Sequence, residues 1–162
     1  MNMIGTKFYK DNFSVEEYNI AANWCNETQL ATIEDKGEYY EVVEIPPPSL
    51  EEVKEWKINE LKNIRNSKEL DPIEYNNHLF DADKDSLDRL NYAIITLSTT
   101  HTDQINWTCA DNTDTVMSVN DLNMVIANVG IRSNDLHIKY RLLKEQVNQA
   151  QTVEEVNSII WE

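Results

Sequence analysis

The chain has 162 residues, of which 29 are acidic and 14 are basic, so its formal net charge is −15. With 41% apolar residues, only 3 glycines and only 4 prolines, its composition is that of a globular protein and excludes a disordered or fibrous chain. Every third of the chain is acidic, and nucleic-acid binding needs clustered Lys and Arg for its phosphate contacts, so we expect no nucleic-acid partner.

Secretion and membrane insertion are not expected either. Residues 1–7 lack the apolar segment of a signal peptide, and no apolar run approaches the length of a membrane span. We therefore expect no membrane partner and synthesis in a cytosol. Cys25 and Cys109 are then interpreted as buried, reduced thiols, with a disulfide as the less favoured alternative.

A small β-α-β-β unit, or an α-β-β unit if the first strand is not paired, is predicted for residues 1–45. Ser14 and Glu17 have the spacing of a capping box at the start of a helix, in which the serine caps the helix and the glutamate returns a bond. Asp35-Lys36-Gly37 has the composition of a hairpin turn. The expected elements are a strand at 6–9, a helix from 14 and strands at 29–33 and 39–45.

The three prolines at 46–48 predict a linker, because proline stiffens the chain into an extended spacer. They separate the first unit from residues 49–162, for which we predict an independent, mostly helical domain with one β-hairpin. The fold class is therefore α+β. The predicted hairpin pairs 104–109 with 115–118, and residues 75–80 are a short strand or the extended arm of a loop.

Helix caps and apolar stripes define the helices expected in this second domain. Capping boxes at Ser49, Ser118 and Thr152 start three of them, and Asp85 or Ser86 caps another. Gly130 is predicted to end the helix from 118, as glycine does at a helix C-terminus. A further helix then runs from about 134 to 150, and the last one ends at 161. The apolar stripes are Leu50, Val53, Trp56, Leu61 and Ile64; Leu87, Leu90, Ile94 and Leu97; Val119, Leu122, Ile126 and Val129; and Leu136, Tyr140, Leu143, Val147 and Ala150.

The acidic segment at 81–85 has part of the pattern of a calcium-binding loop. Asp81, Asp83 and Asp85 stand at the first, third and fifth positions of an EF-hand loop. Such a loop also needs glycine at position six and glutamate at position twelve, where this chain has Ser86 and Tyr92. We interpret the three acids as helix-capping residues, and a metal site stays the alternative.

No catalytic or cofactor-binding constellation is predicted. The three histidines lie far apart in the sequence, and three glycines cannot form a phosphate-binding loop. Cys109 with His101 is the one nucleophile–base pair that can be drawn, but Cys109 falls in an alternating strand pattern. We therefore expect no catalytic residues, no cofactor and no metal.

Two tryptophans are candidates for either packing or binding. Trp107 lies in the predicted hairpin and is interpreted as a core residue, with an exposed binding aromatic as the alternative. Trp161 follows Ile159 and Ile160 and is interpreted as an anchor of the chain end on the domain core. The alternative for Trp161 is an exposed anchor for a partner.

Several segments occur in an order and spacing that resembles a known family. They are a proline-rich stretch and a helix with Lys57–Leu61, Tyr75 to Asp83, a helix through Arg89 and Ile94, Trp107-Thr108-Cys109-Ala110-Asp111-Asn112, the helix start at 118–122, Tyr140-Arg141-Leu142-Leu143-Lys144, and Trp161. Together they resemble domain of unknown function 4376, which is found in tail gene clusters of bacteriophages and prophages. The first 45 residues resemble the leader domain that often precedes it.

The resemblance implies a place in the virion tail, made in the bacterial host cytoplasm, and brings no catalytic residues with it. We expect a non-catalytic tail protein near the baseplate or tail-fibre attachment that contacts other tail proteins in multiple copies within a symmetric assembly. A tail-fibre assembly chaperone and a small acidic regulatory or metal-binding protein are the alternatives. The candidate structural or interaction residues are Trp107, Asp111, Asn112, Tyr140 and Trp161.

Overall fold

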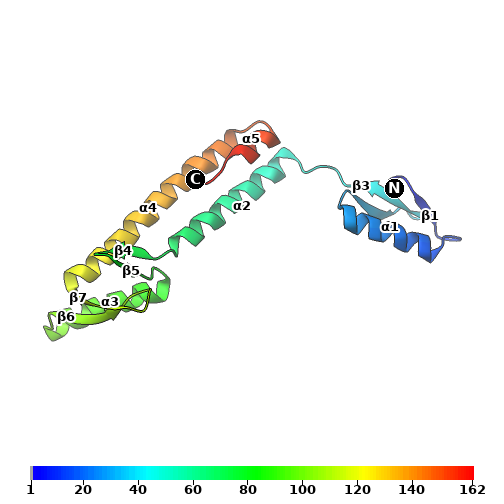
Figure 1. Cartoon of the computed structure of the whole chain (residues 1–162). Coiled ribbons are helices and arrows are strands. Elements are labelled where there is room, and N and C mark those ends of the chain that lie inside the picture. Colours follow the sequence, from blue (N-terminus) through cyan, green and yellow to red (C-terminus); the bar gives the residue numbers. More distant parts are fainter. Residues whose placement is uncertain (1) are drawn as a thin grey trace. The chain divides into compact units, whose positions relative to one another are not determined.

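The computed structural model describes residues 2–162 and confirms the α+β fold class. The chain divides into two compact units, one up to Pro48 and one from Ser49 onward, which are described separately below. Figure 1 shows the elements in chain order. No described helix has both the length and the apolar content needed to cross a membrane.

The first unit is the predicted β-α-β-β arrangement. It contains β1 (Lys7–Tyr9), α1 (Val15–Thr28), β2 (Ala31–Asp35) and β3 (Tyr39–Glu44). The strands form one antiparallel sheet in the order β1-β3-β2, with Phe8 opposite Tyr40 and Ile33 opposite Val42. Side chains from α1 and the strands bury a small core: Phe8, Ala21, Cys25, Ala31 and Val42.

The start of β2 differs from the prediction by two residues. Gln29 was expected in the strand, but it has a left-handed backbone (φ 57°) and its N–H donates to the Cys25 carbonyl 3.0 Å away. Gln29 is therefore the C-cap of α1, and its N–H gives a carbonyl of the last helical turn a hydrogen-bond partner. The turn at Gly37 (φ 89°) is as expected, and the Asp35 carboxylate accepts the Gly37 N–H at 2.8 Å.

The second unit is built on two long helices that lie side by side, α2 and α4 (Figure 1). Both hairpins and α3 gather at one end of this pair, and α5 packs at the other. Its elements are α2 (Leu50–Glu69), β4 (Ile73–Tyr75), β5 (His78–Phe80), α3 (Lys84–Thr100), β6 (Gln104–Thr108), β7 (Asp114–Ser118), α4 (Val119–Gln149) and α5 (Val153–Ser158).

Two separate hydrophobic clusters hold this unit together. The first joins α3, α4 and the hairpins, and the second joins α2, α4 and α5. The first comprises Phe80, Leu90, Ala93, Leu97, Cys109, Met117, Leu122 and Val125. The second comprises Val53, Leu61, Val147, Ala150 and Val156.

The prediction that Gly130 ends a helix is wrong, because α4 runs through it without a break from Val119 to Gln149. The buried side chains of α4 lie on both sides of the glycine, with Val129 before it and Val147 after it. A glycine inside a helix costs about 1 kcal/mol relative to alanine. Burial of one valine side chain contributes more than that, so packing on both sides overrides the local stop signal.

Residues 75–80 form a second β-hairpin, where one strand or a loop arm was predicted. Asn76 and Asn77 both have positive φ (49° and 62°) and join β4 to β5. Positive φ at both central residues is the geometry of the two-residue hairpin turn that matches strand twist, and asparagine tolerates it.

The cap of α3 and one face of α2 also differ from the prediction. Asp83 caps α3, since its carboxylate accepts the Ser86 N–H, whereas Asp85 or Ser86 was expected. Trp56 is 60% exposed and lies off the α2 stripe. At 100° per residue it projects about 140° away from Leu61. The side chain of Lys57, which is only 12% exposed, lies closer to the buried face.

Two of the four predicted capping boxes are complete. At Ser49 and Ser118 the serine accepts a backbone N–H and the acid three residues on returns a bond. At Ser14 and Thr152 the hydroxyl accepts its N–H, but Glu155 accepts from the Gln151 N–H instead of from the cap. The last helix ends at Ser158, earlier than predicted.

Gly130→Ala is expected to stabilise the second unit by about 0.5–1 kcal/mol, because the site is helical and a Cβ there meets no atom within 4 Å. Chemical denaturation of the full chain measures the change. Gly37→Ala is the matched control and should destabilise, since φ at Gly37 is 89°. An equal or lower stability of Gly130→Ala would contradict this reading of α4.

Candidate functional site

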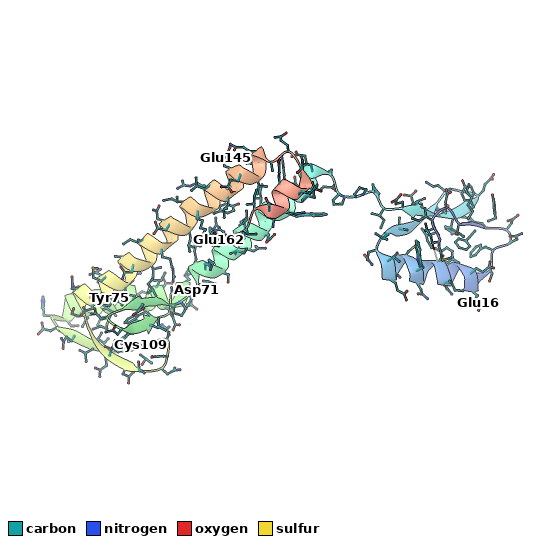
Figure 2. The ribbon with its side chains drawn as sticks, turned by 45° about the horizontal axis from the view of Figure 1, so that its top comes forward. Glu16, Asp71, Tyr75, Cys109, Glu145 and Glu162 are labelled. Carbon is teal, nitrogen blue, oxygen red and sulfur yellow. The ribbon has the colours of Figure 1, made fainter. Side chains whose placement is uncertain are left out.

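The five candidate residues fall into two groups in the second unit. Trp107 lies in β6, and Asp111 and Asn112 follow it in the loop to β7. Tyr140 lies in α4, and Trp161 follows α5 near the chain end. Figure 2 shows this separation through two labelled neighbours, Cys109 beside α3 and the hairpins and Glu162 beside α2.

The β6–β7 loop is closed by its own polar groups. The Cys109 N–H donates to the Thr113 carbonyl at 2.7 Å, and the Asp111 carboxylate accepts both the N–H and the hydroxyl of Thr113. These two bonds from Thr113, the hydroxyl first, hold the pKa of Asp111 below its usual value. Asn112 takes a left-handed backbone (φ 62°) that asparagine tolerates. The loop therefore has one defined conformation.

Trp107 and Cys109 lie on the inner side of this hairpin. The half-buried Trp107 packs against the first hydrophobic cluster, and its indole also lines an open cavity with Asn112. Cys109 is a buried free thiol whose pKa is raised by burial. A raised pKa disfavours the thiolate that nucleophilic attack requires. Asp111 does not line the cavity; its role in the structure is the loop bond to Thr113.

Tyr140 and Trp161 belong to the second cluster. Both are half-buried against it, and each ring has a cation near its face. The Arg65 guanidinium lies 4.9 Å from the centre of the Tyr140 ring, and the Lys139 ammonium lies 5.6 Å from that of Trp161. Lys139 also donates to the backbone carbonyl of Glu162. These contacts fasten the end of the chain to α4.

Two polar connections were missed by the sequence analysis. The Tyr75 hydroxyl donates to the Asp121 carboxylate at 2.8 Å and so joins β4 to the first turn of α4. The Arg132 guanidinium donates to the carbonyls of Glu69 and Pro72 and so covers the end of α2. Neither residue pair has a characteristic spacing, because the partners are more than forty positions apart in sequence.

The acids of the possible calcium loop have separate positions in the structure. Asp83 uses its carboxylate to cap α3, and the hydroxyl and N–H of Ser86 hold the pKa of Asp83 below its usual value. Asp81 lines the cavity beside Trp107. Across residues 2–162, no three acidic, histidine or cysteine side chains converge as a metal site requires.

Asp121→Asn is expected to make stability less dependent on pH. The Ser118 hydroxyl, then the Ser118 N–H and the Tyr75 hydroxyl, lower the pKa of Asp121. A lowered pKa contributes stability that is present above the unfolded value of about 3.9 and is lost as the pH falls through the folded value.

The variant should therefore lose about 1 kcal/mol at neutral pH and progressively less below about pH 4, as measured by circular dichroism melts. Asp135→Asn, an exposed carboxylate of the same helix, is the control. A loss of equal size at every pH would show that the Asp121 charge contributes nothing.

Trp161→Ala is expected to lower stability by about 1–3 kcal/mol, less than the 3–5 kcal/mol of a fully buried tryptophan, because its ring is half-buried against the second cluster. Trp56→Ala removes an exposed indole and should change stability by less than about 0.5 kcal/mol. Thermal melts of the full chain compare the two. If Trp161→Ala melts like the parent, Trp161 is an anchor for a partner instead.

Comparison with known proteins gives one match. Residues 52–160 match the family described as Domain of unknown function (DUF4376), which covers most of the second unit and leaves the first unit outside. No curated protein and no solved structure matches the chain. The family resemblance carried by the spaced motifs is thereby confirmed, and the chain belongs to the family of domain of unknown function 4376.

Proposed function

We propose that this chain is a non-catalytic structural protein of a bacteriophage tail, located near the baseplate or the tail-fibre attachment and acting through protein–protein contacts. The location is supported by the resemblance of its motifs to a family found in tail gene clusters. The contact function is supported by one observation, an apolar row on the exposed side of α4.

This exposed row consists of Met124, Ile131, Ile138 and Leu142, which are 42%, 61%, 41% and 62% exposed. At 100° per residue the four side chains fall within an arc of about 40°. With a rise of 1.5 Å per residue they extend over about 27 Å of the helix. Single exposed apolar residues are normal on a protein surface, whereas an aligned row is typical of an interaction surface.

The row does not contribute to either hydrophobic cluster. The buried residues of α4, Leu122, Val125, Val129 and Val147, project from the opposite side of the helix, about 160° from the centre of the row. The two apolar faces of α4 therefore have separate roles. One face packs the domain, and the other remains available to a partner.

The partner that fits the exposed row is a helix of another tail protein. The spacing of seven residues from Met124 to Ile131 and again to Ile138 is the repeat with which helices pack along one another. A net charge of −15 opposes close packing of a second copy and favours a partner with a basic surface. Multiple copies are then arranged by the partner's symmetry.

The double variant Ile131→Gln/Ile138→Gln is expected to fold normally and to disappear from purified particles. The host cell produces the variant during infection by a phage from which the gene for this chain has been deleted. Quantitative mass spectrometry of the purified particles then measures the ratio of the variant to the other tail proteins. The matched control is Ile20→Gln/Ile95→Gln, which changes two exposed isoleucines of α1 and α3 and should incorporate like the parent.

Two results would contradict the proposal. Normal incorporation of the row variant would show that α4 does not make the contact. Absence of the unaltered chain from complete particles, together with fibre loss when the chain is deleted, would establish the assembly chaperone instead.

A further inference from the structure

An open cavity of about 370 Å³ lies between the start of α3 and the β6–β7 hairpin. Its polar and aromatic lining comes from three separate segments, namely Asp81 before α3, Arg89 within α3, and the hairpin with its loop. The hairpin supplies Asn106, Trp107, Thr108 and Asn112. Residues from distant segments that converge on one concave surface are typical of a small-molecule site.

The guanidinium of Arg89 is held in place by a buried hydroxyl. Arg89 Nη2 donates to Ser86 Oγ at 2.7 Å, and Ser86 Oγ donates to Asp83 Oδ2 at 2.6 Å. Ser86 is only 2% exposed, so this connection is protected from competition by water. A side chain oriented before a ligand arrives loses less entropy when it binds one.

The hairpin side of the cavity is equally fixed. Trp107 packs against the first hydrophobic cluster, which holds its indole in position along the cavity. The loop that carries Asn112 is tied to β5, because the Ala110 N–H donates to the Leu79 carbonyl at 2.8 Å. The Asn112 N–H donates to the Cys109 carbonyl at 3.0 Å, which fixes the backbone from which its side chain projects.

The chemistry of this lining selects among ligand classes. One guanidinium and one carboxylate leave the lining without net charge, whereas a phosphate-rich ligand needs several cations or a row of N–H groups. The side-chain amide of Asn112 both donates and accepts hydrogen bonds, whereas the Thr108 hydroxyl already donates to the Asp114 carboxylate at 2.7 Å. An indole face adds a flat apolar surface.

From this combination we infer that the cavity binds an uncharged saccharide. Neighbouring hydroxyls of a sugar ring are both donors and acceptors, so they match the carboxylate, amide and guanidinium groups, and the C–H face of the ring packs on the indole. A volume of about 370 Å³ accommodates one or two sugar units. This site is independent of the exposed row on α4 and goes beyond the proposed contact function.

The test is heteronuclear NMR on the ¹⁵N-labelled full chain. The probes are the methyl glycosides of glucose, galactose, mannose, rhamnose and N-acetylglucosamine, with sodium acetate as an anionic comparison. We expect at least one glycoside to shift the Trp107 indole N–H and backbone amides within 106–112, with a dissociation constant in the millimolar range typical of so small a ligand.

Two variants with matched controls assign the response to the cavity. Asn112→Gly removes the amide and keeps the left-handed backbone, and Asn77→Gly makes the same change at the same φ of 62° in the β4–β5 turn. Arg89→Gln removes the guanidinium, and Arg141→Gln does so at an exposed position of α4. The two cavity variants should weaken binding at least about tenfold, and the two controls should bind like the parent.

Three results would overturn the inference. The first is that no glycoside shifts the Trp107 indole N–H. The second is that the cavity variants bind a glycoside as well as their controls do. The third is that acetate shifts these resonances while the glycosides leave them unchanged, which would make the cavity a carboxylate site centred on Arg89.

Discussion

The packing of one face of α4 at both of its ends is the interaction on which the second unit depends. Near its start, Leu122 and Val125 complete the cluster formed by α3 and the hairpins, and near its end Val147 completes the cluster formed with α2 and α5. Each cluster alone is small, and a larger folded unit buries a larger fraction of its surface. Both clusters bury side chains of the same helix, so both stabilise α4 as one continuous element. This explains why α4 continues through Gly130.

This arrangement also determines where the polar features lie. The Tyr75–Asp121 bond joins a hairpin to the first turn of α4, and Arg132 covers the end of α2 from the middle of α4. The cavity beside Trp107 is formed by the hairpin and α3, which the first cluster holds together. The exposed apolar row remains on the opposite side of the same helix. One helix thus carries a buried packing face and an exposed apolar face.

Local signals predicted most of the elements, and tertiary packing decided where they failed. Hydroxyl caps at Ser14, Ser49, Ser118 and Thr152 start helices where expected, and alternation predicted β6 and β7, because both signals act within a few residues. The helix end predicted at Gly130 is wrong, because the free-energy cost of a glycine inside a helix is small compared with the gain from burying side chains elsewhere along α4. The family resemblance identified Trp107 and Asn112 as candidate structural or interaction residues. Ser86 and Arg89 are three residues apart on α3, so helical spacing places them side by side, but no sequence signal showed that the β6–β7 hairpin would form a cavity beside them.

The spacing of the two clusters along α4 has a consequence for motion. Between Val129 and Val147 the helix has no buried residue, so the two ends of the unit share backbone but no side-chain core. Their free energies of opening are therefore only partly coupled, and each end behaves as its own cooperative unit. We therefore expect release of α5 and the chain end to leave the hairpins and α3 folded on the first turns of α4. Amide protons in α5 then exchange with solvent through local opening, long before those of β6 and β7 do.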